Sequence, residues 1–291
     1  MTATGPSPTP SKIRVIDRAL AMGITLFETA DCYGENGRME RRLGERLPKD
    51  GSALIVTKLG TRRDTGVPRK DFSVDYLKEA FARSQERLQR DVVDCVLLHN
   101  PSRQAFENPA LGEFMRGLKS AGQVRCWGAS VGTGEAGHAA IDAGADVLAI
   151  AYNVLHIQEL AELEPEIREK QLGLLGRSLL AHGLLCGLWP PNKEFISGDH
   201  RSERWSNDEL RRRITQLNAL RTLLSQKLPS LRSIALRYAL SNELLSSGVL
   251  GPRTSLQLDQ LVREAGKAPP YLEPNQILDL RERLITVGVY L

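Results

Sequence analysis

Phe27-Glu-Thr-Ala-Asp-Cys-Tyr-Gly34 is the stretch of sequence that decides how the rest of the chain is interpreted. It follows a short apolar run and precedes a segment with helical periodicity, which predicts a β-strand that ends in a loop. Glu28 and Tyr33 lie at this strand end, and two later strands are predicted to end at Lys58 and His99. A tyrosine, a lysine, a histidine and a carboxylate at one place can together deliver a proton to a carbonyl oxygen.

Outward from this stretch, helical and strand-like segments alternate in the manner of consecutive βα units. Strands are predicted to end at Glu28, Lys58, His99, Ser130, Asn153, Gly176 and Gly251. Helices are predicted over residues 11–22, 38–47, 73–88, 114–119, 135–143, 157–170, 208–226, 230–240, 256–264 and 274–284. Nearly continuous apolar runs such as residues 96–98 are typical of parallel strands that are buried on both faces. The predicted fold class is therefore α/β, a (β/α)8 TIM-type barrel.

An eighth strand is missing from the expected place before the first helix. Residues 1–12 contain three prolines, which lack the N–H that a ladder needs, so a flexible arm is expected there and a single barrel domain over residues 13–291. The β-branched tail 285–291 could fill the empty position by a right-handed crossover, as a natural circular rearrangement. The alternative is a tail packed on the outside of a barrel whose first strand is absent.

Composition and charge exclude several functional classes. The chain has 291 residues, 41% hydrophobic and 25% charged, with a net charge of +4, which argues against a nucleic-acid-binding surface. No apolar run approaches the ~20 residues of a membrane span. The four cysteines are far apart, so neither a disulfide framework nor a zinc site is indicated, and reduced thiols in a cytoplasmic protein are expected.

An ordered set of motifs surrounds the candidate residues. Residues 27–34 are similar to the signature Asp-Thr-Ala-x-x-Tyr-Gly of a known family. Further similar segments are Glu40 with Leu43-Gly44, Thr57-Lys58, residues 94–101, residues 122–130, Tyr152-Asn153, residues 177–187 and residues 251–254. Over residues 13–265 the chain thus resembles the aldo-keto reductases. The resemblance implies a carbonyl reductase that uses a nicotinamide cofactor and no metal, with a small-molecule aldehyde or ketone as substrate.

The resemblance also implies a role for each candidate catalytic residue. Tyr33 would donate a proton to the carbonyl oxygen, His99 would orient and polarise the carbonyl, and Glu28 would hold Lys58. A tyrosine with the usual pKa of about 10 is a reluctant donor, and the Lys58 cation is expected to lower that pKa. Taken alone, each residue is better explained as a surface or packing residue. Their position at three successive strand ends favours the catalytic interpretation.

On the cofactor side, the resemblance implies a binding set that consists of Ser130, Arg177, Leu180, Gly183, Leu185, Gly251, Arg253, Thr254 and Gln257. Ser130 would contact the carboxamide, and backbone N–H groups of the loop 180–185 would lie over the pyrophosphate, near Arg177. Arg253 and Thr254 would bind the adenosine 2′-phosphate, which favours NADPH over NADH. A surface salt bridge is the alternative for Arg253.

Four positions depart from the family pattern. Glu28 replaces an aspartate, Val131 and Ala149 replace two amide side chains that usually hold the nicotinamide, and Leu261 replaces an asparagine near the adenine. These changes imply weaker cofactor binding or a remodelled pocket. Two alternatives therefore remain: a cofactor-independent acid–base enzyme such as a dehydratase or isomerase, and a non-catalytic regulatory relative.

The substrate itself is not named by the sequence. The polar segment 190–207 is expected to lack regular structure and to act as a lid. Trp189 and Trp205 could face an apolar substrate or could simply pack. A second chain could cover edges left by the missing strand, so a homodimer is compatible with the sequence.

Overall fold

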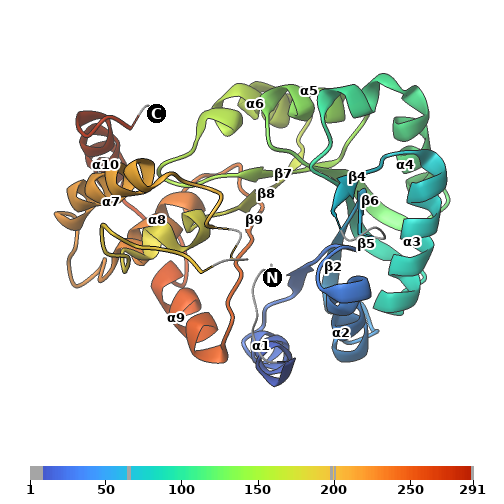
Figure 1. The fold of residues 1–291 in the computed structure, drawn as a ribbon, viewed down its shortest axis with the longest axis horizontal. Coiled ribbons are helices and arrows are strands. Elements are labelled where there is room, and N and C mark those ends of the chain that lie inside the picture. Colours follow the sequence, from blue (N-terminus) through green and yellow to red (C-terminus); the bar gives the residue numbers. More distant parts are fainter. Residues whose placement is uncertain (1–8, 64–66, 197–198, 200, 290–291) are drawn as a thin grey trace.

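The computed structural model describes residues 9–63, 67–196, 199 and 201–289. Seven parallel strands form one curled sheet in the order β1-β2-β5-β6-β7-β8-β9, and helices surround it (Figure 1). The strands are β1 (Leu26–Glu28), β2 (Leu54–Leu59), β5 (Val93–His99), β6 (Val124–Ser130), β7 (Val147–Ala151), β8 (Gly173–Arg177) and β9 (Ser247–Gly248). The seven predicted strands are confirmed, with ends shifted by a few residues.

The helices also follow the prediction. They are α1 (Thr9–Ala21), α2 (Arg38–Arg46), α3 (Val74–Leu88), α4 (Pro109–Ser120), α5 (Gly134–Asp142), α6 (Gln158–Glu169), α7 (Asn207–Arg221), α8 (Leu231–Leu240), α9 (Ser255–Ala265) and α10 (Pro274–Thr286). Five elements were not predicted: the hairpin of β3 (Thr61–Arg62) with β4 (Arg69–Lys70), and the short 3-10 helices η1 (Glu35–Gly37), η2 (Arg103–Glu107) and η3 (Ala181–Cys186).

Two apolar clusters divide the core between the two faces of the sheet. The larger cluster lies between the sheet and the helices and includes Val96 and Leu98. The smaller cluster lies inside the curl, where Val56, Cys95 and Leu97 meet. Because successive side chains of a strand point to opposite faces, residues two positions after an inward residue also point inward.

The sheet does not close into a complete barrel. Among the described residues, no strand precedes α1, and β1 and β9 each pair on one side only. Of the two alternatives for the tail 285–291, a strand that fills this gap is wrong for its described residues 285–289, and a tail packed on the outside is confirmed. Ile285 and Thr286 belong to α10, which packs against α7 outside the sheet (Figure 1). The Gln216 side chain donates to the Val287 carbonyl at 3.0 Å, and residues 290–291 lie outside the described part.

Helices bridge the gap that the strands leave. α1 packs against α9, Arg18 forms a 2.7 Å ion pair with Asp259, and the Ser255 hydroxyl donates to the Arg14 carbonyl at 3.3 Å. Residues 9–12 of the expected N-terminal arm are helical, because α1 begins at Thr9, and the rest of that arm lies outside the described residues. None of the described helices combines the length and apolar character that a membrane span requires.

Candidate active site

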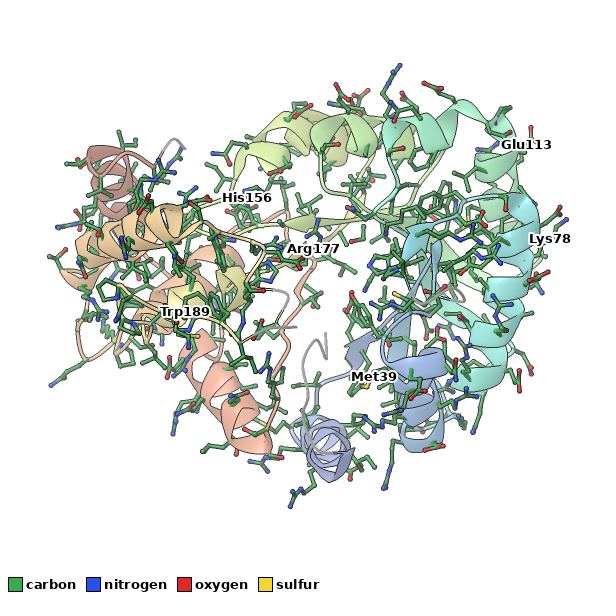
Figure 2. The ribbon with its side chains drawn as sticks, in the orientation of Figure 1. Met39, Lys78, Glu113, His156, Arg177 and Trp189 are labelled. Atoms are coloured by element: carbon green, nitrogen blue, oxygen red, sulfur yellow. The ribbon has the colours of Figure 1, made fainter. Side chains whose placement is uncertain are left out.

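Strand alternation brings five polar side chains to one end of the curled sheet. Leu26, Val56, Leu97, Cys126 and Leu175 line the inner face, each two or four residues before a polar strand-end residue. Those strand-end residues are Glu28, Lys58, His99, Ser130 and Arg177. All lie at the carboxyl ends of parallel strands, where barrel enzymes carry their active sites. Figure 2 shows Arg177 on the inner side of the sheet.

Glu28 and Lys58 form a buried ion pair across β1 and β2. The Lys58 side chain is 2% exposed, and its Nζ contacts Glu28 Oε1 and donates to the Thr29 carbonyl at 2.8 Å. Burial lowers the pKa of Lys58, and the nearby Arg177 charge lowers it further. The contact with Glu28 opposes this effect, because a carboxylate stabilises the ammonium form. The structure therefore places Glu28 where it fixes the position of Lys58.

Tyr33 lies between Lys58 and His99. The Lys58 Nζ is 4.8 Å from the centroid of the Tyr33 ring, and the rings of Tyr33 and His99 meet edge to face at 5.8 Å between centroids. Burial raises the pKa of Tyr33, and the neighbouring Cys32 raises it further. The net pKa of Tyr33 is therefore raised and not lowered as expected, because burial outweighs the lowering effect of nearby cations such as Arg177.

His99 is an uncharged imidazole in this site. Burial lowers the pKa of His99 to about 2, helped by the charges of Lys58 and Lys70. Its Nδ1 lies 3.5 Å from the Sγ of Cys32. A neutral ring keeps one N–H donor, so His99 can donate a hydrogen bond to a substrate oxygen without carrying charge.

Backbone and buried side-chain contacts hold the loop after β1 in place. The Asp31 N–H donates to the Lys58 carbonyl at 3.0 Å, so the loop continues the pairing with β2. Behind it, fully buried Glu40 accepts from Thr57 Oγ1 at 2.6 Å and pairs with Arg87 at 3.2 Å. A side chain at Gly44 would meet the Arg87 carbonyl at 2.2 Å, so only glycine allows this approach of α2 to α3.

Where the nicotinamide was expected, the two altered positions are buried and apolar. Val131 is 1% and Ala149 is 4% exposed, and the Val131 N–H donates to the Ala149 carbonyl at 3.0 Å. Ser130 is also buried, at the end of β6. Arg177 donates to the Val131 carbonyl through Nη2, while its buried Nε has no hydrogen-bond partner among the described residues. A polar ligand group could satisfy that donor.

The loop expected over the pyrophosphate forms η3. The N–H groups of Gly183 and Leu185 both donate to the Leu180 carbonyl, at 2.8 and 3.2 Å. A phosphate would therefore have to share these donors or displace that carbonyl. Leu185 as a whole is fully buried.

The expected phosphate site at the start of α9 has a favourable geometry. Thr254 caps the helix by accepting from the Gln257 N–H at 3.2 Å, and the Gln257 side chain accepts from the Arg253 N–H at 2.8 Å. A guanidinium next to a helix N-terminus suits an anion such as a phosphate. Gly251 is exposed just before this turn, whereas Leu261 is buried in the core.

Sequence reasoning missed one part of the site, the β3–β4 hairpin. Lys70 on β4 donates through Nζ to the His99 carbonyl at 2.5 Å and so adds a cation beside the candidate residues. Strands of two residues show no alternation that a sequence pattern could reveal. The hairpin is visible only once the structure pairs Thr61 with Lys70.

The segment that follows η3 contains an aromatic cluster. Trp189 packs edge to face against Phe195 at 5.1 Å and against Trp205 at 5.9 Å, and Trp205 meets His182 of η3 at 6.2 Å. The packing interpretation of both tryptophans is therefore favoured. The segment 190–207 has no regular helix before Asn207 in its described residues, as expected.

Comparison with known proteins agrees with this geometry. The model of the family described as "Aldo/keto reductase family" matches residues 1–269. A D-threo-aldose 1-dehydrogenase from Pseudomonas sp is 28% identical over 275 residues, covering 84% of this chain and 80% of the relative. An L-galactose dehydrogenase from Arabidopsis thaliana is 24% identical over 274 residues, covering 89% and 79%.

Solved structures share the fold. A glycerol dehydrogenase from Gluconobacter oxydans superposes with a TM-score of 0.85 at 20% identity, covering 99% of this chain and 89% of that one. The holo form of an aldo-keto reductase from Bacillus halodurans superposes with a TM-score of 0.80 at 23% identity, covering 99% and 92%. At this identity the likeness shows the fold alone.

Proposed function

The chain belongs to the aldo/keto reductase family, and from that premise we propose that it is an NADPH-dependent oxidoreductase that reduces an aldehyde or ketone to an alcohol. One observation supports this most: Tyr33 lies between Lys58 and His99, within 4.8 Å of the Lys58 Nζ and 5.8 Å of the His99 ring, measured from its ring centroid. A carbonyl oxygen near the Tyr33 hydroxyl would meet a proton donor, a neutral hydrogen-bond donor and a cation.

The nicotinamide cofactor, when bound, would supply a hydride to the carbonyl carbon. Negative charge then develops on the carbonyl oxygen, and Tyr33 would give its proton to that oxygen. The raised pKa of Tyr33 keeps this proton in place until charge develops, because an alkoxide is a much stronger base than a phenolate. Lys58 would stabilise the resulting phenolate, and His99 would hold the carbonyl by a hydrogen bond.

The residues present fit the 2′-phosphate of the cofactor better than its pyrophosphate or its nicotinamide. Arg253 and Thr254 at the start of α9 would hold the 2′-phosphate, with Gln257 beside the adenosine. The Arg177 Nε, which has no partner among the described residues, offers a donor nearer the centre of the site. These contacts support the choice of NADPH.

A small polar carbonyl compound is the proposed substrate. The relatives from Pseudomonas and Arabidopsis are named for dehydrogenation of sugars, so we propose aldoses and their oxidised forms as the first compounds to test. The cationic residues Lys70 and Arg177 near His99 would favour oxygen-rich substrates.

Cofactor-independent acid–base catalysis is the second candidate. The buried apolar residues Val131 and Ala149, and the loop N–H groups that already bond to Leu180, support it. The proton-transfer residues Tyr33 and His99 would be the same. Turnover that survives removal of all nucleotide would favour this candidate.

The deciding experiment is a titration of the purified full-length chain with NADPH and NADH, followed by tryptophan fluorescence. The proposal expects saturable binding with preference for NADPH, and carbonyl-dependent oxidation of NADPH. Tyr33→Phe should then lower kcat by on the order of 100-fold or more while the affinity for NADPH stays unchanged. Tyr271→Phe, a tyrosine outside the candidate site, is the matched control. Failure of both nucleotides to bind would refute the reductase proposal.

A further inference from the structure

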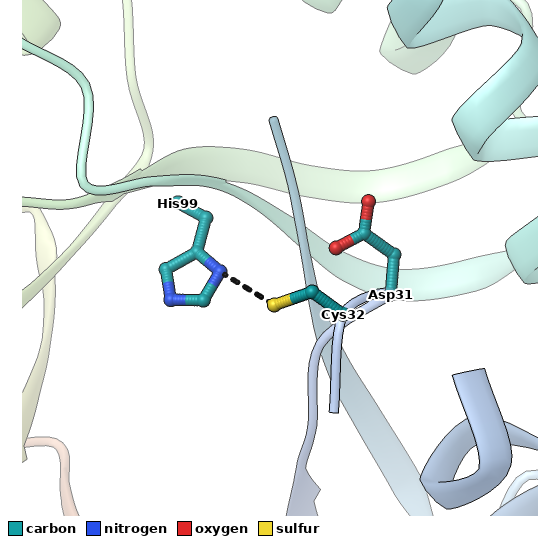
Figure 3. Close-up of side chains that lie close together, drawn as sticks. All are labelled: Asp31, Cys32 and His99. Atoms are coloured by element: carbon teal, nitrogen blue, oxygen red, sulfur yellow. Dashed lines mark hydrogen bonds between the residues drawn. The ribbon is translucent and has the colours of Figure 1, made fainter. Parts of the chain in front are cut away.

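Asp31, Cys32 and His99 form a cluster of three side chains that can each ligate a metal (Figure 3). One ligand atom of each lies within 4.8 Å of the others. Asp31 and Cys32 come from the loop after β1, and His99 ends β5, so the cluster joins residues far apart in the sequence. The reductase proposal gives no role to the Asp31 carboxylate or the Cys32 thiol.

We propose that this cluster is a reversible binding site for Zn²⁺. A thiolate, an imidazole and a carboxylate are the donor types that zinc prefers in proteins, whereas Mg²⁺ and Ca²⁺ select oxygen ligands. With three protein ligands, a water molecule would complete a tetrahedron.

The separation of the two softer donors matches tetrahedral zinc. Bonds of about 2.3 Å to sulfur and about 2.0 Å to nitrogen, at an angle of about 109°, place the two ligand atoms about 3.5 Å apart. The Cys32 Sγ and the His99 Nδ1 are 3.5 Å apart, as the dashed line in Figure 3 marks. The separation of these two ligand atoms is therefore the one that tetrahedral zinc requires.

Asp31 supplies a second, independent observation. Its side chain is only 8% exposed, and its buried Oδ1 has no hydrogen-bond partner among the described side chains and backbone. A buried acceptor without a partner is costly, and a cation bound at the cluster would satisfy it. The backbone around it is fixed, because the Asp31 N–H bonds to the Lys58 carbonyl and Arg87 bonds to the Asp31 carbonyl at 3.4 Å.

Binding of the ion releases one proton and involves no oxidation. The Cys32 S–H bond breaks, an S–Zn bond forms, and the proton leaves to solvent, while the neutral His99 ring and the Asp31 carboxylate each form a bond to the metal through a lone pair. The positive charges of Lys58, Lys70 and Arg177 near His99 repel a divalent ion and so weaken its binding. Occupancy of the site is therefore expected to rise and fall with the concentration of free zinc. The inference does not rest on the proposed reductase function, because its test measures bound metal.

The test uses Co²⁺ as a spectroscopic probe of the chelator-treated full-length chain. The proposal expects one equivalent to bind with a sulfur-to-cobalt charge-transfer band and intense visible bands of tetrahedral cobalt, and expects Zn²⁺ to remove both. Cys32→Ser should remove the charge-transfer band and weaken binding by more than about 100-fold, since outer-shell changes alone cost 10–100-fold. Asp31→Asn should weaken binding and keep the band.

Cys186→Ser and Cys126→Ser are the matched controls, because both thiols are half-buried and lie outside the cluster. Both should bind cobalt like the unmodified chain. No charge-transfer band in the unmodified chain would overturn the proposal, and so would a band that persists in Cys32→Ser or disappears in Cys126→Ser. If Cys32→Ser does not fold, unchanged cobalt affinity in Asp31→Asn would overturn it.

Discussion

The buried pair of Glu28 and Lys58 makes a strong prediction about stability. Both side chains are less than a tenth exposed, so Glu28→Gln leaves a buried ammonium without its counter-charge. Removing one partner of such a pair costs about 3–5 kcal/mol. We expect the lower end, about 3 kcal/mol, because the Thr29 carbonyl still accepts from Lys58. For a chain of this size that lowers Tm by roughly 6–12 °C.

The double variant Glu28→Gln/Lys58→Met separates pairing from simple loss of contacts. Replacing both charges removes the unpaired ion, so the double variant should lie within about 1 kcal/mol of the unmodified chain. Thermal unfolding followed by circular dichroism at neutral pH measures Glu28→Gln, Lys58→Met and the double variant. Glu164→Gln, which breaks the exposed 2.8 Å pair with Arg168, is the control and should cost less than about 1 kcal/mol. A double variant as unstable as the sum of its single variants would refute the reasoning.

Three further outcomes are expected. Glu28→Asp withdraws the carboxylate from Lys58 by about 1.5 Å, so kcat should fall by on the order of 10-fold to 100-fold in steady-state assays, and a rise would show that glutamate is the weaker choice. Arg253→Met should weaken NADPH binding by roughly 10–100-fold and leave NADH binding unchanged in fluorescence titrations. An equal loss of affinity for NADPH and NADH would contradict a contact with the 2′-phosphate. Burial raises the pKa of Glu264, but hydrogen bonds, first from Arg232, outweigh burial, so the net pKa is lowered. The ion pair of Glu264 with Arg232 therefore stabilises the fold above the unfolded pKa of about 4.3, and this stabilisation is lost as the pH falls through the folded pKa. Urea titrations of Glu264→Gln should therefore differ from the unmodified chain at neutral pH and converge with it in acid.

The position of the catalytic candidates was predictable because strands alternate. Inward residues such as Val56 and Leu97 predict that Lys58 and His99 point inward as well, and the sequence shows this parity directly. The pKa of Tyr33 was not predictable, because it depends on burial by segments distant in the sequence. The spacing of residues or motifs along the sequence does not reveal how deeply a side chain is buried.

The sequence left the place of the tail open and did not reveal the ligand cluster, for different reasons. Ile285 and Thr286 are β-branched, which favours a strand, but they end α10, in which Leu280 and Leu284 are buried. Tertiary packing outweighs such local preferences. The proposed zinc ligands were missed because spacing rules for metal sites depend on cysteines and histidines that lie close together in the sequence, whereas Cys32 lies 67 residues from His99.

The contact between α1 and α9 has a consequence for how the chain folds. In the main sheet, each strand pairs with the strand of that sheet that comes next in the sequence. The β3–β4 hairpin, which interrupts this order, pairs two strands that are close in the sequence. Among the described elements, the contact of α1 with α9, which includes the ion pair of Arg18 with Asp259, joins the two ends of the ring. Contacts between distant parts of a chain slow folding, because their loop entropy is lost before they form. The sheet can therefore grow strand by strand as the ribosome releases the chain, and the ring is closed by a helical contact made last.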